Sequence, residues 1–211
     1  MLPGARRIVS VEFGHRYVVR PEGHSAARQV IPLLVDGIEY AHLTVRLFQE
    51  LDRLGQHLKT SRSDIAVYSS LDRNPLLRLE YRADLHTEPV CHWQFHAERG
   101  AFATLLARAH RLGRVSKPHL LSSLHLPVGG ERFRPGLEDV LEFLVRDCGV
   151  DAKPGWQVAV TESRQTWRRR QLRAAVRDLQ EEAAEVLRHE GWMVAPPDDP
   201  LPAHTAPYRH W

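Results

Sequence analysis

Two neighbouring segments in the middle of the chain alternate apolar and polar residues with a period of two. In residues 76–82 (LLRLEYR) apolar and charged residues alternate after the first leucine. Residues 91–96 (CHWQFH) alternate in the same way, with two histidines and a glutamine on the polar face. A period of two is typical of a strand with one buried face. We therefore expect an antiparallel hairpin of these two segments, with residues 65–68 (IAVY) as a third strand.

The segments before and after this hairpin predict helices. Apolar residues recur at steps of three and four from residue 38 to residue 58, which is the period of an amphipathic helix. Residues 101–112, 135–145 and 161–189 predict three more helices. The apolar stripe of the last helix is Leu172, Val176, Leu179, Ala183, Val186 and Leu187. The prediction is an α+β fold: a small antiparallel sheet, a helical hairpin-like N-terminal part and a long C-terminal helix packed on the sheet. Residues 1–192 form one domain, and residues 193–211 a Pro-rich C-terminal tail.

Composition excludes several classes of protein. The chain has 211 residues, of which 43% are hydrophobic and 26% charged, as in ordinary globular proteins. Two cysteines, Cys91 and Cys148, are too few for a disulfide scaffold, and we interpret both as reduced core residues. No stretch approaches the roughly 20 apolar residues of a membrane helix. The first residues also lack the apolar core of a signal peptide, so we expect a cytoplasmic protein.

The net charge of +3 hides two basic blocks. Residues 99–134 contain seven Lys and Arg against one acid, and residues 164–177 contain six Arg and no acid. The rest of the chain is therefore acidic. Such an asymmetry predicts a face that binds a polyanion, although the same arginines can also pair with acids on a solvated surface.

His92 and His96 are the first candidates for chemistry. Four residues along a strand separate them by about 13 Å, so one metal ion cannot bridge them. A metal site would need partners such as His86, His119 or His125. Two other interpretations remain open: acid–base groups lining a groove, or solvent-facing histidines with no chemistry.

Arginines of the predicted long helix are the second candidates. Arg169, Arg173 and Arg177 recur every fourth residue, so they share a helix face and can follow a phosphate backbone, with Trp167 stacking on a base. The structural alternative is an ordinary ion pair of Arg177 with Glu181 and a core position for Trp167.

Several short motifs resemble the TumE-like toxins of bacterial toxin–antitoxin modules. They are residues 77–81 (LRLEY), Pro89, His92 with His96, and residues 134–141 (RPGLEDVL), all within residues 76–147. The family carries an Arg-Tyr-Asp-like motif where this chain has Glu80 and Arg82 around Tyr81. The resemblance implies a small α+β fold, interference with translation, with RNA cleavage as one route, and an antitoxin with a helix-turn-helix domain as partner. It also implies that His92 and His96 are the functional pair, with Arg78 and Tyr81 beside them.

The functional prediction is a toxin-like or defence-associated bacterial protein that acts on RNA or translation through a basic groove beside a His-bearing strand. Its reaction would be ribonuclease-like phosphodiester cleavage, with no cofactor and no metal. The alternative is a non-catalytic module that docks a partner protein through the Arg-rich helix and the Pro-rich tail. The predicted catalytic residues are His92, His96 and Tyr81, and the predicted nucleic-acid-binding residues are Arg78, Arg132, Arg134, Arg169, Arg173 and Arg177.

Overall fold

The computed structural model describes residues 2–25, 29–70, 74–85, 89–96, 126–129 and 131–209. The predicted helix at residues 101–112 lies outside this part of the chain. The strands are β1 (Ile8–Phe13), β2 (Arg16–Pro21), β3 (Ile31–Val35), β4 (Ile38–Leu51), β5 (Leu58–Ser69), β6 (Pro75–Arg82), β7 (Cys91–Phe95) and β8 (Leu126–Pro127). The helices are α2 (Leu137–Arg146), α3 (Trp156–Asp178), α4 (Gln180–His189) and the short 3₁₀ helix η3 (Ala206–Tyr208).

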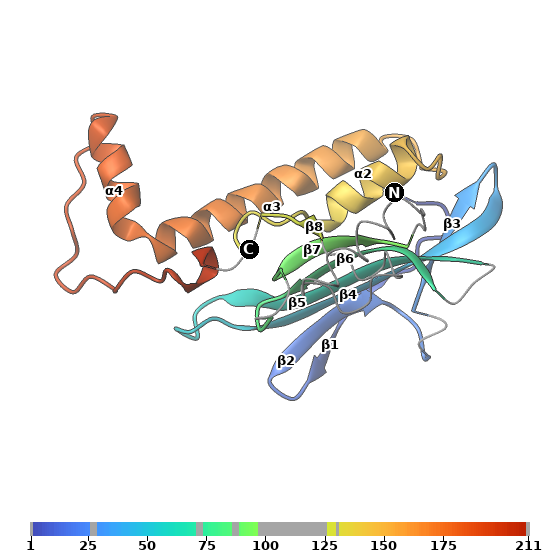
Figure 1. Cartoon of the computed structure of the whole chain (residues 1–211), viewed down its shortest axis with the longest axis horizontal. Coiled ribbons are helices and arrows are strands. Elements are labelled where there is room, and N and C mark those ends of the chain that lie inside the picture. Colours follow the sequence, from blue (N-terminus) through green and yellow to red (C-terminus); the bar gives the residue numbers. More distant parts are fainter. Residues whose placement is uncertain are drawn as a thin grey trace, which may run out of the picture.

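The described strands form one eight-stranded antiparallel sheet with α2 and α3 over one face (Figure 1). The strand order is β1-β2-β4-β5-β6-β7-β8, and β3 also pairs with β4. β4 is long enough for both, because residues 38–43 pair with β3 and residues 47–49 pair with β2 along the same edge. The α+β class, the antiparallel sheet and the β6–β7 hairpin are thus confirmed.

The prediction of a helical N-terminal part is wrong. Residues 38–58, predicted as a helix, form β4, a tight loop and the first residue of β5. In β4 it is Leu43 and Val45, two residues apart, that are buried. Leu54 lies in the loop, Leu58 is the first residue of β5, and both are exposed. The apparent helical period therefore joined residues of a strand to residues of a hairpin loop, in which the Asp52 carboxylate accepts the N–H groups of residues 54, 56 and 57.

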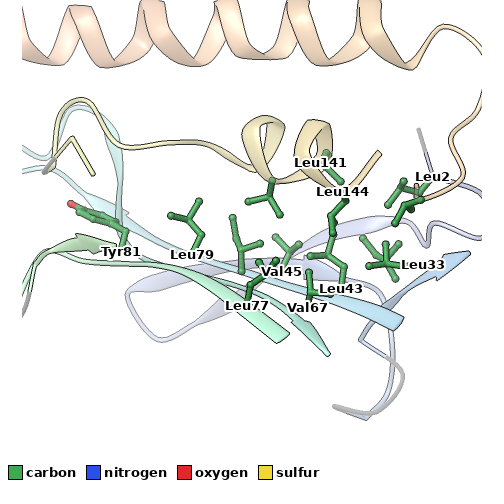
Figure 2. Close-up of a cluster of buried hydrophobic side chains, with 14 of the residues drawn as sticks. Leu2, Leu33, Leu43, Val45, Val67, Leu77, Leu79, Tyr81, Leu141 and Leu144 are labelled. Atoms are coloured by element: carbon green, nitrogen blue, oxygen red, sulfur yellow. The ribbon is translucent and has the colours of Figure 1, made fainter. Parts of the chain in front are cut away.

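The hydrophobic core lies between the sheet and α2 (Figure 2). The predicted buried face of β6 is confirmed, because Leu77, Leu79 and Tyr81 are at most 5% exposed. α2 places Leu141 and Leu144 on these strands. Burial of about four large side chains of this kind contributes roughly 6–12 kcal/mol to folding, and this is the main force that holds α2 on the sheet.

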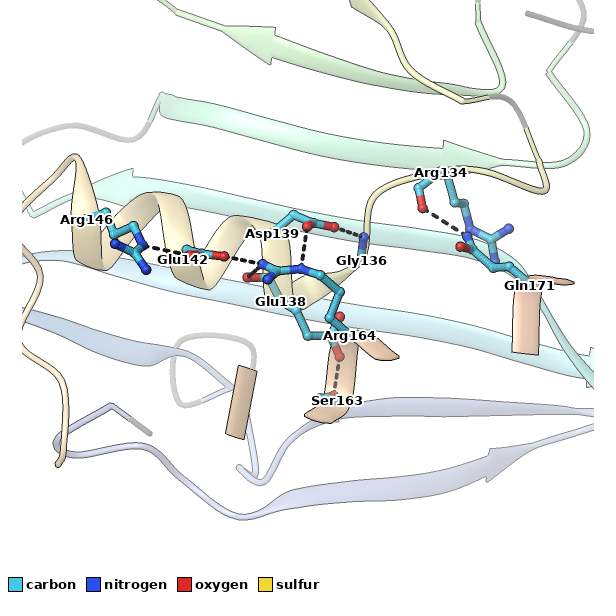
Figure 3. A network of polar contacts seen from close by, with 9 residues as sticks. All are labelled: Arg134, Gly136, Glu138, Asp139, Glu142, Arg146, Ser163, Arg164 and Gln171. Carbon is cyan, nitrogen blue, oxygen red and sulfur yellow. Dashed lines mark hydrogen bonds and ion pairs between the residues drawn. The ribbon is translucent and has the colours of Figure 1, made fainter. Parts of the chain in front are cut away.

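Polar contacts fix α2 and α3 to each other (Figure 3). The predicted helix at residues 135–145 is confirmed as α2, and the Asp139 carboxylate accepts the N–H of Gly136 at 2.8 Å to cap it. From α3, the Arg164 guanidinium donates to Asp139 at 3.0 Å and also to Glu142. These bonds orient α3 across the top of α2.

The predicted long helix over residues 161–189 is broken. Leu179 has φ −128° and ψ 70°, outside the helical region, so α3 ends at Asp178 and α4 begins at Gln180. The predicted apolar stripe does not face the core either: Leu172, Val176 and Val186 are all exposed. The stripe was predicted for one continuous helix, and the break turns its two halves in different directions.

The C-terminal tail returns to the body of the protein. The backbone N–H of His204 donates to the carbonyl of Asp178 at 2.8 Å, and Pro207 is buried. Both cysteines were expected in the core, and this is confirmed for Cys91 but wrong for Cys148, which is exposed. Burial raises the pKa of the Cys91 thiol to about 12. Among the described helices, none has the length and apolar composition needed to cross a membrane.

Candidate functional site

The sheet face opposite the core carries a row of charged residues across four strands. The strand register places Arg46 of β4 beside Asp64 of β5, Asp64 beside Glu80 of β6, and Glu80 beside His92 of β7. Residues directly opposite each other in antiparallel strands share a face. We call this face of β4–β7 the polar face. Its other members used below are Arg62 and Arg78, and His96, whose backbone N–H donates to the carbonyl of Leu76 directly after β7, continues the alternation.

His92 and Glu80 form the centre of the polar face. The His92 side chain is only 2% exposed, so it is not one of the solvent-facing histidines that the sequence left open. Its Nδ1 lies 2.8 Å from the carbonyl oxygen of Pro89, and a carbonyl only accepts, so Nδ1 carries the proton. Its Nε2 lies 3.6 Å from the Glu80 carboxylate. The contact with His92 is the main reason that the pKa of Glu80 is lowered, against the opposing effect of burial.

Arg78 and His96 flank this pair. Arg78 contacts Glu80 at 3.9 Å, and its side chain is 36% exposed. His96 follows β7 and is half-buried. Burial, and then the charge of Arg78, lower the pKa of His96. Within the described part of the chain, His96 Nε2 is buried and has no hydrogen-bond partner.

Arg62 and Asp64 extend the polar face over β5. The Arg62 guanidinium binds the Asp64 carboxylate through two nitrogens, at 2.7 and 2.8 Å, and lies over the ring of Phe48. This pairing leaves Glu80 as the carboxylate that faces His92. The arrangement therefore combines a cation, an ionised carboxylate and two imidazoles, which are the groups that proton transfer beside a phosphate requires.

Tyr81 lies on the other side of the sheet. Its ring is buried in the core, and burial raises the pKa of its hydroxyl. The Arg134 guanidinium stacks over this ring, 3.8 Å from its centroid, and lies 5.0 Å from the ring of Trp167 on its other side. The structure thus separates Tyr81 and Arg134 from His92 and His96 by the thickness of the sheet.

Arg132 is also occupied on the core side. It donates to the Glu131 and Asp178 carboxylates, each at 2.5 Å, and its side chain is 16% exposed. Arg132 and Arg134, both predicted to bind phosphate, are thus held in internal contacts beneath α3.

The predicted phosphate-binding arginines of α3 lie on the outward side of this helix. Arg169, Arg173 and Arg177 are exposed. Trp167 points inward, against Gly136 and Arg134, so the interpretation of Trp167 as a core residue is the correct one. The ion pair of Arg177 with Glu181 does not form among the described contacts, because the helix breaks between the two residues. α3 covers the core face of the sheet, so these arginines and the polar face are on opposite sides (Figure 1).

Sequence reasoning missed Glu80 and Asp64. Their signal was the alternation itself, because it places Glu80 on the same face as Arg78 and excludes Tyr81 from that face. The register that brings Glu80 beside His92 depends on residues 83–89, whose sequence does not specify the length of the turn.

Comparison of the chain with protein-family models, with curated proteins and with solved structures finds no match. Among the described residues, no three His, Cys, Asp or Glu side chains are grouped so that they could hold a metal ion.

Proposed function

We propose that this chain is a toxin-like or defence-associated protein that acts on RNA, and that the polar face is where it cleaves the phosphodiester bond. The observation that supports the proposal is the grouping of Arg78, Glu80 and His92 on one face of two paired strands, with His96 directly after β7 near Arg78 and Glu80. The resemblance of residues 76–147 to TumE-like toxins is consistent with it, and such a toxin would have an antitoxin with a helix-turn-helix domain as partner.

Each of these four side chains has a distinct role in the proposed reaction. The Glu80 carboxylate takes the proton of a ribose 2′-hydroxyl, and the 2′-oxygen attacks the adjacent phosphorus. The bond from phosphorus to the 5′-oxygen breaks, and the His96 imidazolium gives its proton to that oxygen. Arg78 stabilises the negative charge on the phosphoryl oxygens. The products are a 2′,3′-cyclic phosphate and a 5′-hydroxyl.

His92 is a positioning residue in this scheme. A side chain that is 2% exposed does not touch substrate. Its two ring nitrogens lie against the Pro89 carbonyl oxygen and the Glu80 carboxylate, and the contact with His92 lowers the pKa of Glu80.

Cleavage of a defined RNA oligonucleotide by the purified full chain, with EDTA present, tests the proposal. We expect 2′,3′-cyclic phosphate ends, and losses of about a hundredfold or more in Glu80→Gln and His96→Asn. Arg146→Ala, an exposed arginine on α2, is the matched control for Arg78→Ala and should cleave like the wild type. No cleavage by the wild-type chain, or equal cleavage by wild type and all three polar-face variants, would contradict the proposal.

The alternative function is a binding module that docks a partner protein through the Arg-rich helix. The observation that favours it is the exposure of apolar Leu172 and Val176 beside the arginines of α3. In that case the polar-face variants are silent, and reversal of the α3 charges abolishes partner binding.

A further inference from the structure

α4 packs only weakly on the rest of the described chain, because its most covered residues, Gln180, Ala183 and Ala184, are half-buried. It has ten residues, and none of them is buried. Val186 and Leu187 are 62% and 39% exposed, and Trp192, just after the helix, is 67% exposed. An isolated helix of fewer than about 12–15 residues is marginal in water, so α4 needs another surface to be stable.

α3 presents a second unpartnered surface. Leu172 and Val176 lie one turn apart on its outward side and are 60% and 44% exposed. Arg169 and Arg173 lie next to them on the same side. Among the described contacts, no ion pair involves any of the five arginines between residues 168 and 177. Like-charged neighbours on one helix repel each other, so this surface favours an acidic partner.

The charge of α4 is the complement of that of α3. Glu182 and Glu190 lie one turn before and one turn after Val186, and Glu185 is beside them. The described residues form no ion pair with these glutamates either. Within one chain the two surfaces do not meet, because α4 leaves the end of α3 at a steep angle after Leu179 (Figure 1).

We propose that the occupant of both surfaces is a second copy of this chain. In a two-fold dimer, α3 of each copy packs against α4 of the other, so the same contact forms twice. Leu172 and Val176 of one copy cover Val186 and Leu187 of its partner, and the arginines of α3 face the glutamates of α4. This dimer uses no residue of the polar face, so its test does not depend on whether the chain cleaves RNA.

Charge reversal of the full chain, followed by sedimentation equilibrium, tests the dimer. We expect wild-type protein to be a dimer that weakens as salt increases. The basic-to-acid variant (Arg169→Glu, Arg173→Glu, Arg177→Glu) and the acid-to-basic variant (Glu182→Lys, Glu185→Lys, Glu190→Lys) should each raise the dissociation constant about a hundredfold, because each places like charges in contact. An equimolar mixture of the two variants restores every opposite-charge contact and should form a heterodimer as stable as the wild type.

A monomeric wild-type chain, or a dimer that survives in both variants, would overturn the proposal. If the wild type is monomeric and the basic-to-acid variant loses binding to an RNA oligonucleotide or to another protein, that ligand is the occupant instead. Circular dichroism and urea unfolding of each variant establish that it folds. Leu172→Ser with Val186→Ser provides a second route to a monomer if a charge variant does not fold.

Discussion

Asp178 connects three separate parts of the chain, and its substitution by asparagine should weaken all three. Its side chain is 9% exposed and accepts a hydrogen bond from Arg132 Nε at 2.5 Å. From the tail, His204 Nδ1 lies 3.2 Å from its other oxygen, and the Tyr208 hydroxyl donates at 3.5 Å. Asp178→Asn keeps the shape of the side chain and removes its charge.

The loss of unfolding free energy expected for Asp178→Asn follows from these contacts. Arg132 keeps Glu131 as a counter-charge, so the loss is mainly that of one hydrogen bond between charged groups, about 1.5–3 kcal/mol. His204 is 35% exposed and the Tyr208 contact is long, so together they add about 0.5 kcal/mol. The free energy of unfolding should therefore fall by about 2–3.5 kcal/mol.

Urea unfolding and limited proteolysis measure the two effects. In a double-mutant cycle, Arg132→Met and Asp178→Asn should be coupled by about 1–3 kcal/mol. Protease should cut residues 192–203 faster in Asp178→Asn, because the tail loses its anchor. An unfolding free energy within about 0.5 kcal/mol of the wild type, with unchanged proteolysis of the tail, would refute the reasoning.

Three further predictions concern the sheet. Tyr81→Phe should change the free energy of unfolding by less than about 1 kcal/mol and leave RNA cleavage unchanged, because the ring still stacks on Arg134. Tyr81→Ala should lower the free energy of unfolding by about 3–5 kcal/mol. Loss of cleavage in Tyr81→Phe would place the hydroxyl in the reaction. The rate of RNA cleavage should rise as Glu80 ionises and fall as His96 loses its proton. Because the pKa of Glu80 lies below its ordinary 4.5 and that of His96 below its ordinary 6.5, the pH–rate profile should peak below pH 6.5. A maximum above neutrality would contradict these roles. Because the pKa of Glu80 is lowered in the folded state, its ionised carboxylate stabilises the folded state above pH 4.5, and this contribution is lost as the pH falls through the folded-state pKa. The urea midpoint of Glu80→Gln should therefore depend less on pH in that acidic range than the midpoint of the wild type.

The sequence predicted the fold best where one period dominates a segment. Residues 77–82 and 91–95 alternate apolar and polar residues without exception, and both segments are strands. Residues 38–58 fit two periods at once, and only the pairing of β4 with β2, β3 and β5 decides between them. Helix propensity is a weak influence beside such pairing, because most of the stability of either element comes from tertiary packing.

The candidate site could be predicted in part. Alternation alone places Arg78 on the polar face and Tyr81 in the core, so it separates Tyr81 from the histidines. The internal roles of Arg132 and Arg134 could not be predicted, because the Arg134 stack needs Tyr81 and Trp167, which are 86 residues apart in sequence (167 − 81), to meet. The break at Leu179 has no strong sequence signal either, since neither glycine nor proline occurs there.

The two proposed surfaces lie on opposite sides of one sheet, and this separation makes their effects distinguishable. A packed sheet and helix layer is about 10 Å thick, so a charge reversed on the outward side of α3 is more than a Debye length from His96 at physiological salt. Reversal of Arg169, Arg173 and Arg177 should therefore dissociate the dimer without changing the pH–rate profile of cleavage on each chain. A shift in that profile would mean that the arginines of α3 share the substrate with Arg78, and the dimer interface would then have to lie elsewhere.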